Sequence, residues 1–193
     1  MLTILLVRPG ATDYDMQGRI QGTLDIPLSE DGLRQVQACL EGVRALSPVA
    51  VYHGPCESAE QTAQLLSAEM GLRPKAMPSL RNLDHGLWQG MLVSDVKTKQ
   101  PKVYRQWQEQ PETVCPPQGE TVLDAKARVA EGLRKLMKKH KEGTVAVVVA
   151  EPMASVFRHV LKHDGLSGFW KLSEKCGMWE SIEAPETLLA PAS

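Results

Sequence analysis

The sequence lacks the features that would commit it to nucleic acid or to a membrane. Its 22 lysines and arginines nearly balance 23 aspartates and glutamates, so the net charge is −1. A chain without a basic surplus has no general attraction for nucleic acid or for an anionic membrane surface. Its apolar runs are also too short to span a bilayer. We therefore expect neither nucleic-acid binding nor membrane insertion.

Cysteine is scarce as well. The four cysteines are Cys39, Cys56, Cys115 and Cys176, and no two of them form a CxxC pair. This spacing is typical of reduced thiols rather than of a zinc site, and we expect the cysteines to be small buried hydrophobic side chains. The short apolar stretch at the N-terminus has no basic segment before it, so we expect no signal peptide and a cytoplasmic location.

What the sequence does contain is a regular alternation of apolar runs and helical patterns. The continuous apolar runs are residues 2–7, 49–52 and 144–149. Such runs are typical of strands buried on both faces. Apolar residues at helical spacing predict helices over 33–43, 59–70, 124–140 and 155–161, with Ser29 as the cap of the first. This alternation predicts an α/β fold in which helices cover both faces of a mostly parallel sheet.

Charged and conformationally restricted residues follow two of the predicted strands. Arg8 and Pro9 come directly after the first run, and Ala150 and Glu151 come directly after the run at 144–149. Ligand sites in open α/β sheets lie beyond the carboxyl ends of the strands. We therefore expect Pro9 and Glu151 to face one cleft.

Residues 6–38, LVRPGATDYDMQGRIQGTLDIPLSEDGLRQVQA, resemble the opening of the histidine phosphatase superfamily, which includes the cofactor-dependent phosphoglycerate mutases. Three later segments also resemble family motifs: RNLDHGLWQG (81–90), PPQGET (116–121) and VVVAEPMASVFRHVL (147–161). The resemblance covers about residues 2–183. It implies a phosphoglycerate mutase-like three-layer sandwich, with one domain over 1–183 and a flexible tail over 184–193.

The resemblance also implies where the catalytic groups should lie. In the family, a first-loop histidine attacks phosphorus, two arginines and a second histidine bind the phosphate oxygens, and an acidic residue protonates the leaving group. Here the nucleophile position falls on Pro9, the second arginine on Ser58, the acid on Asn82 and the second histidine on Glu151, while Arg8 keeps the family residue. Since the proline ring nitrogen has no free lone pair, we predict that the phosphohistidine route is closed.

The positions that match the family's binding residues define an expected phosphate pocket. The expected pocket residues are Arg8, Arg19, His85, Gly119, Glu120, Thr121 and Glu151. We expect Arg8 and Glu151 to form an ion pair, because an unpaired buried charge is costly. The alternative for Arg19 is a surface arginine bonded to Asp15 or to a backbone carbonyl. The alternative for residues 119–121 is a turn held by its own hydrogen bonds.

These substitutions lead us to expect a catalytically inactive pseudophosphatase with a binding, scaffolding or regulatory role. The alternative is a weak or relocated phosphatase or phosphoglycerate mutase-type phosphoryl transfer, with His53 or His85 as the replacement catalyst. A structural role in an oligomer is a third hypothesis. We expect no metal and no cofactor. The sequence leaves open which protein or small molecule is the partner and whether the chain forms a homodimer.

Overall fold

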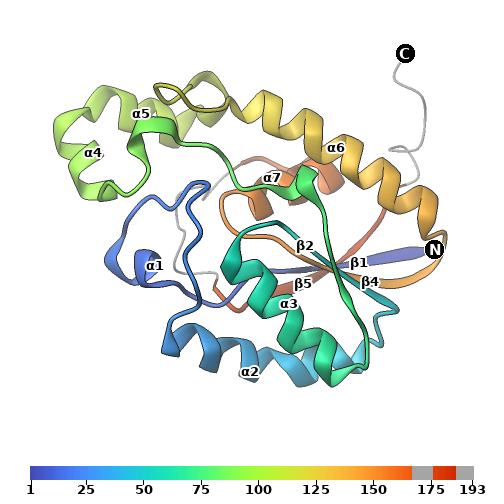
Figure 1. Cartoon of the computed structure of the whole chain (residues 1–193). Coiled ribbons are helices and arrows are strands. Elements are labelled where there is room, and N and C mark those ends of the chain that lie inside the picture. The colour runs from blue at the N-terminus through green and yellow to red at the C-terminus, as the bar shows by residue number, and fades with distance from the viewer. Residues whose placement is uncertain (167–175, 186–193) are drawn as a thin grey trace, which may run out of the picture.

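A five-stranded sheet forms the centre of the computed structural model, which describes residues 1–166 and 176–185 (Figure 1). The strands are β1 (Leu2–Val7), β2 (Ala50–His53), β3 (Pro74–Ala76), β4 (Gly143–Val148) and β5 (Trp179–Glu183). Their spatial order is β3-β2-β4-β1-β5. Strands β1 to β4 run parallel, and β5 pairs antiparallel with β1 at the edge of the sheet.

The predicted pairing of the first and last apolar runs is confirmed. In the β1–β4 ladder, Leu2 lies opposite Gly143 and Val7 lies opposite Val148. The sequence did not predict β3, which has three residues and begins with a proline. It also did not predict β5, in which Glu180 and Glu183 interrupt the apolar pattern.

Seven α-helices are present in the described residues. They are α1 (Asp13–Gln17), α2 (Glu30–Ala45), α3 (Glu57–Glu69), α4 (Val93–Lys99), α5 (Pro101–Glu109), α6 (Val122–Lys139) and α7 (Met153–Lys162). The four predicted helices correspond to α2, α3, α6 and α7. The expected cap of α2 is confirmed, since the Ser29 hydroxyl accepts a hydrogen bond from the Gly32 backbone N–H at 3.0 Å.

Helices cover both faces of the sheet, as the sequence predicted. Helices α6 and α7 lie on one face and α2 and α3 on the other (Figure 1). Along β1, Ile4 and Leu6 pack into the core beneath α6 and α7, while Leu5 and Val7 pack into the core beneath α2 and α3. This two-sided burial explains the continuous apolar run, because each fully buried aliphatic side chain contributes roughly 1.5–3 kcal/mol.

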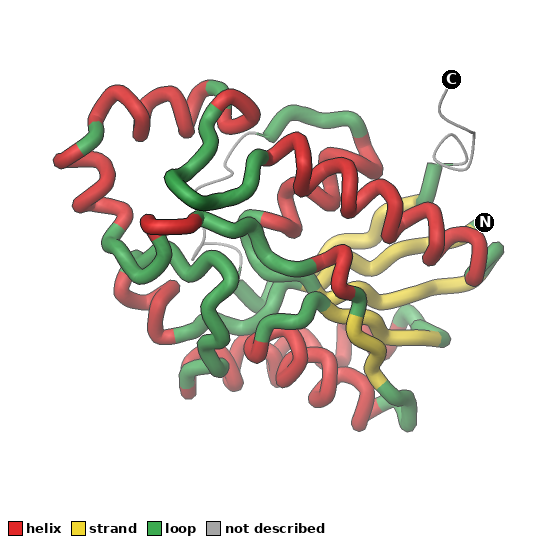
Figure 2. The backbone as a smooth tube through the Cα atoms, turned by 45° about the horizontal axis from the view of Figure 1, so that its top comes forward, coloured by secondary structure: helices red, strands yellow, loops and turns green. Residues whose placement is uncertain are grey.

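A third, smaller apolar cluster lies beyond the carboxyl ends of the strands. It consists of Ile20, Trp88, Val96, Trp107 and Val114. Helices α4 and α5 carry part of this cluster and project away from the sheet (Figure 2). Helices α4 and α5 and the apolar cluster beneath them therefore lie beside the loops that follow β1 and β4.

Three expectations about the chain as a whole have different outcomes. Cys39 and Cys56 are buried, but Cys115 is exposed and Cys176 is partly exposed, so the prediction of four buried cysteines is wrong. Cys115 lies in the loop that follows the 3₁₀ helix Pro111–Thr113, outside any helix or strand that would turn it toward the core. The domain boundary at 183 stays a prediction, and most of the proposed tail lies outside the described residues. No helix in the described part of the chain is long and apolar enough to cross a membrane.

Candidate functional site

A small pocket lies where the loops after β1 and β4 meet. Its lining consists of Arg8, Pro9, Gly10, Asp15, Gln21, Ser58, Ala150, Glu151 and Cys176. We call it the Arg8 pocket. The expectation that Pro9 and Glu151 share one cleft is confirmed. Parallel strands produce this arrangement, because their carboxyl ends meet at the same edge of the sheet.

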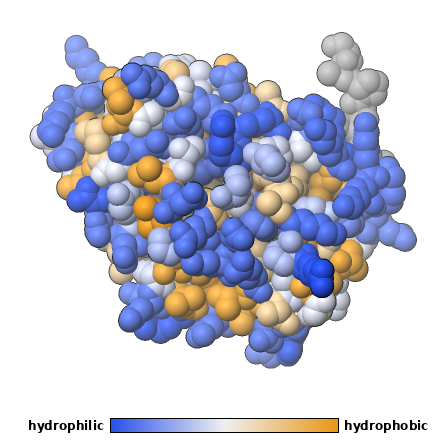
Figure 3. Space-filling view, in the orientation of Figure 1, coloured by the Kyte–Doolittle hydropathy of each residue, from blue (hydrophilic) through white to orange (hydrophobic). Residues whose placement is uncertain are grey.

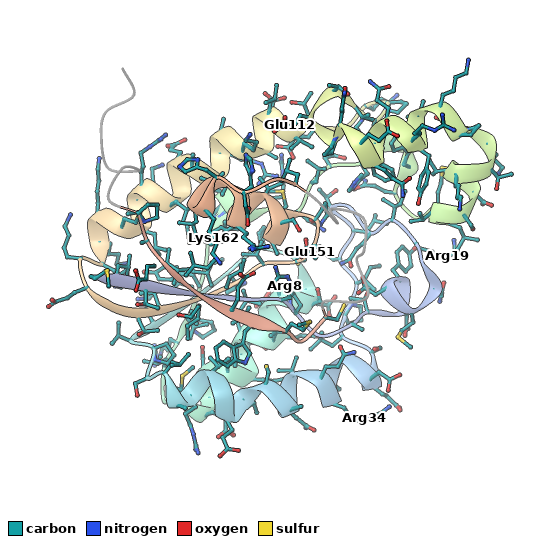
Figure 4. The ribbon with its side chains drawn as sticks, turned by 180° about the vertical axis from the view of Figure 1, so that it is seen from behind. Arg8, Arg19, Arg34, Glu112, Glu151 and Lys162 are labelled. Atoms are coloured by element: carbon teal, nitrogen blue, oxygen red, sulfur yellow. The ribbon has the colours of Figure 1, made fainter. Side chains whose placement is uncertain are left out.

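Arg8 is held between two carboxylates. Its Nε donates to Glu151 Oε1 at 2.8 Å, and its Nη2 donates to Glu180 Oε1 at 3.0 Å. Burial opposes the charged form, but the hydrogen bonds and charges of Glu151 and Glu180 outweigh it, so the pKa of Arg8 is raised. Figure 4 shows Arg8 and Glu151 next to each other, and the predicted ion pair is confirmed.

Hydrogen bonds to both the side chain and the backbone of Glu151 fix its position. Its Oε2 accepts from the Ser155 hydroxyl at 2.8 Å and from the Ser155 backbone N–H at 3.1 Å, in the first turn of α7. Asn82 Nδ2 donates to the Glu151 backbone carbonyl at 3.2 Å. The carboxylate is therefore aimed at Arg8 by a helix N-terminus, where negative charge is favoured.

The pocket contains more acidic than basic side chains. Asp15 also lines it, and its carboxylate accepts from the Thr12 backbone N–H and hydroxyl, each at 2.7 Å. Ser58, which the resemblance matches to the family's second arginine, also lines the pocket, and its side chain is buried. A phosphate must compete with carboxylates for Arg8. At an effective dielectric near 20, one such contact is worth about 4 kcal/mol before desolvation.

Arg19 lies outside the pocket and apart from Arg8 (Figure 4). Its Nη1 donates to the Gly90 backbone carbonyl at 2.7 Å, and its Nε donates to Gln17 at 2.7 Å. The assignment of Arg19 to the pocket is therefore corrected. Its alternative, a bond to a backbone carbonyl, is confirmed. The short α1 ends at Gln17 and turns the arginine toward the loop at Gly90.

The two histidines considered as replacement catalysts are buried elsewhere. His85 is 1% exposed and its ring makes an edge contact with Trp107, with centroids 5.6 Å apart. Burial lowers the pKa of His85 to about 4. His53 is 5% exposed, and its Nδ1 lies 2.8 Å from the Gly54 carbonyl oxygen. Neither ring lines the Arg8 pocket. The assignment of His85 to the phosphate pocket is therefore corrected, and neither histidine lies where it could replace the nucleophile at Pro9.

Residues 119–121 form a turn rather than part of the pocket. Gly119 N–H donates to the Pro116 carbonyl at 2.9 Å, and Thr121 caps α6 by accepting from the Asp124 N–H at 3.1 Å. Glu120 accepts two hydrogen bonds from Arg128, at 2.7 and 2.8 Å. Their assignment to the phosphate pocket is corrected. The alternative of a turn held by its own hydrogen bonds is confirmed for Gly119 and Thr121, whereas Glu120 is held from outside by Arg128 and by the Asp84 carbonyl at 2.8 Å.

The structure adds pocket residues that the sequence reasoning missed. Asp15 and Gln21 are within the opening segment quoted for the resemblance, which was the available signal. Glu180 does not line the pocket but contacts Arg8, and it had no signal, because it reaches Arg8 only through the antiparallel pairing of β5 with β1. In the described residues, no group of three or more histidine, cysteine, aspartate or glutamate side chains is placed to hold a metal ion.

Comparison with known proteins settles the family. The model of the histidine phosphatase superfamily (branch 1) matches residues 4–183. The chain belongs to this superfamily. Phosphoserine phosphatase 1 of Hydrogenobacter thermophilus is 32% identical over 171 residues, which are 88% of this chain and 81% of the relative. The metal-independent phosphoserine phosphatase of Arabidopsis thaliana is 34% identical over 149 residues, 75% of this chain and 62% of that relative.

Two solved structures share the fold of this chain. The mycobacterial glucosyl-3-phosphoglycerate phosphatase complexed with VO3 has a TM-score of 0.80 and 26% identity, covering 88% of this chain and 86% of that chain. Bacillus stearothermophilus YhfR has a TM-score of 0.86 and 22% identity, covering 96% and 93%. The predicted phosphoglycerate mutase-like α/β fold is confirmed.

These relatives overturn the expectation of a catalytically inactive protein. Those named for an activity are phosphatases, and they include relatives about one-third identical over most of this chain. Inactivity was expected because four family positions are replaced here: the nucleophile by Pro9, the second arginine by Ser58, the acid by Asn82 and the second histidine by Glu151. Hydrolysis of a phosphate ester needs a positioned nucleophile and charge stabilisation, and water can be that nucleophile. The pseudophosphatase interpretation is withdrawn.

Proposed function

We propose that this chain hydrolyses small phosphomonoesters by attack of water instead of a histidine. Membership of the superfamily and the names of its relatives support a phosphatase. The observation that carries the proposal is the 2.8 Å contact of Arg8 with Glu151 at the carboxyl ends of β1 and β4. It places a phosphate-binding cation beside a carboxylate that can accept a proton. Phosphoserine and phosphoglycerates are the first substrates to test.

The phosphate binds where Arg8 can donate to its oxygens. Glu180 can release Arg8 without becoming an unpaired charge, because Glu180 Oε2 also lies 3.2 Å from Arg158 Nε and 3.3 Å from Lys162 Nζ. Glu151 keeps its bonds to Ser155 while the substrate binds. Arg8 therefore exchanges one carboxylate for the phosphate and keeps the other in position.

The reaction is a single displacement. The oxygen of water attacks phosphorus as the ester P–O bond breaks. Glu151 accepts a proton from the attacking water, and a solvent water protonates the leaving alcohol oxygen on the opposite side of phosphorus. The hydroxide that remains takes up the proton that Glu151 then releases, so the products are the alcohol and inorganic phosphate. Pro9 provides no nucleophile, and no phosphorylated intermediate forms. Losing a nucleophile from a catalytic unit costs as much as roughly 10⁶ in rate, so we expect slow turnover.

Phosphate release from phosphoserine and 3-phosphoglycerate tests the proposal, with chelator present and protein repurified on a second column. We expect release above buffer, at least about tenfold lower in Glu151→Gln and Arg8→Met. The matched control Glu41→Gln changes an exposed carboxylate of α2 and should keep full activity. Near-ultraviolet circular dichroism checks that each variant is folded.

The stereochemical course at phosphorus separates the mechanisms. A single displacement inverts a chiral phosphate ester, whereas a phosphorylated intermediate gives retention. Inversion supports water as the nucleophile. Retention, or no turnover by the unmodified protein with either substrate, overturns the proposal.

A further inference from the structure

A larger cavity lies on the other side of the molecule from β5, between α6 and the segment formed by β3 and the 3₁₀ helix Pro78–Leu80. Its volume is about 580 Å³, and it shares no lining residue with the Arg8 pocket. We call it the α6 groove. Volumes of about 300–1,000 Å³ are typical of sites that bind small molecules.

The floor of the α6 groove is apolar. Met77 and Pro78 come from one wall and Leu136 from α6. Gly132 lets α6 come close to this wall, because a Cβ atom there would collide with Ser79 Oγ. Figure 3 shows this face, and hydrophobic residues appear among hydrophilic ones where α6 approaches the β3 segment. The floor therefore suits an aliphatic chain rather than a polar ring that needs hydrogen-bonding partners.

The rim of the groove is cationic. Four of its lining residues are arginine or lysine and one, Glu131, is a carboxylate. Arg81 and Arg128 share Glu120, at 3.6 and 2.7 Å, and Lys135 pairs with Glu131 at 2.6 Å. These pairs leave a positive surplus at the end of α6, where the next lining cation is Lys139.

The surplus is concentrated around Tyr52. Lys139 Nζ lies 5.8 Å and Lys75 Nζ 5.9 Å from the centroid of its ring. The Tyr52 hydroxyl lies 2.9 Å from His140 Nε2. Burial, Lys139 and Lys75 together lower the pKa of His140, which is how a positive local potential acts on an imidazole. An anion placed here would meet positive charge from two elements.

We propose that the α6 groove binds a medium-chain carboxylate. The aliphatic chain lies on Met77 and Leu136, and the carboxylate faces Lys139 beside Tyr52. The charge complements the rim and the chain covers apolar surface that would otherwise contact water. This binding does not depend on the proposed hydrolysis, since none of these residues lines the Arg8 pocket.

Titration calorimetry of the full chain with decanoate, below its micelle concentration, tests the proposal. We expect one decanoate per chain and weaker binding as salt rises. Decyltrimethylammonium has the same chain length and the opposite charge, and it should bind at least about tenfold more weakly, because the rim repels it.

Two variants locate the site. Lys139→Glu reverses an exposed rim charge and should weaken decanoate binding about tenfold or more. Ala76→Trp, at an exposed groove residue, should fill the cavity and abolish binding. The matched control Lys102→Glu makes the same charge change on exposed α5 and should bind as the unmodified protein does. Equal binding of both detergents, no binding, or decanoate affinity unaffected by both groove variants overturns the proposal.

Discussion

The Arg8 pocket and the α6 groove share no lining residue and hold opposite balances of charge. In the pocket, one buried arginine contacts Glu151 and Glu180, and Asp15 adds a third carboxylate nearby. In the groove, four cations line an open surface with one carboxylate among them. Buried ions must find partners, while exposed ions are solvated by water.

This difference separates charges that hold the fold together from charges that remain available to a ligand. Arg8 is 6% exposed, so most of its interactions are with protein atoms. Lys139 is exposed, and its Nζ lies 5.8 Å from the centroid of the Tyr52 ring. Removing a positive charge should therefore lower the free energy of unfolding strongly in the Arg8 pocket and only slightly in the α6 groove.

The largest expected effect comes from breaking the pocket pair. Arg8→Met leaves Glu151 and Glu180 without their shared cation and should lower the free energy of unfolding by about 3–5 kcal/mol. Urea unfolding measures this change. The control Arg34→Met removes an exposed arginine that pairs with Asp31 and should cost less than about 1 kcal/mol. Equal losses in the two variants would refute the comparison.

His85 sharpens the comparison, because it is a buried titratable group that belongs to neither region. Its pKa of about 4 lies below that of an unfolded histidine, so the unfolded chain gains a proton first as the pH falls. Neutral His85 therefore contributes up to about 3 kcal/mol to the free energy of unfolding. This contribution is complete above pH 6.5 and is lost as the pH falls toward 4.

Unfolding free energies at pH 7 and pH 4.5 test this dependence. His85→Phe removes the titrating ring beside Trp107 and should reduce the acid loss of stability. His163→Asn, at an exposed histidine, should leave that loss unchanged. An identical acid loss in His85→Phe and the unmodified protein would show that other groups cause it.

Arg128 lies between the two extremes. It lines the groove, yet its guanidinium bonds both oxygens of Glu120 and the Ser79 carbonyl at 2.7 Å. Arg128→Met should cost about 2 kcal/mol, because charge-assisted hydrogen bonds to a partly buried partner are lost. Thermal and urea unfolding measure it. A cost as small as that of an exposed lysine would place Arg128 with the groove cations instead.

The smallest expected effect is at Lys139. Lys139→Met should change the free energy of unfolding by less than about 0.5 kcal/mol, because the ammonium is exposed and makes one cation–π contact with Tyr52. The same urea series measures it. A loss comparable to that of Arg8→Met would mean that the groove charges also support the fold.

The sequence predicted the central strands, the four long helices and the position of the pocket. Continuous apolar runs, helical spacing and Ser29 are local signals, and each acts through residues close to it in the chain. The Arg8–Glu151 pair was also predictable, because two loops at equivalent strand ends carry opposite charges. The inference from the replaced family positions to inactivity was wrong, because the absence of the family's own catalytic residues was taken to exclude the reaction.

The assignments of Arg19, His85 and residues 119–121 could not be corrected from sequence. Each matched a position in a family motif, but a motif position does not say which neighbours a side chain will find. His85 packs on Trp107, which lies 22 positions further along the chain. Arg19 bonds a carbonyl at Gly90.

The sequence by itself determined the family, the core strands and the residues after those strands, because apolar period and motif order are properties of consecutive residues. Only the tertiary structure decided which charged side chains contact a partner of opposite charge. Glu180 reaches Arg8 from 172 positions away because β5 pairs antiparallel with β1, placing Glu180 opposite Leu6. The close approach of Ser79 to α6 beside the groove likewise depends on Gly132, because a Cβ atom there would collide with Ser79 Oγ. Contacts between distant segments depend on packing geometry, which no local pattern encodes.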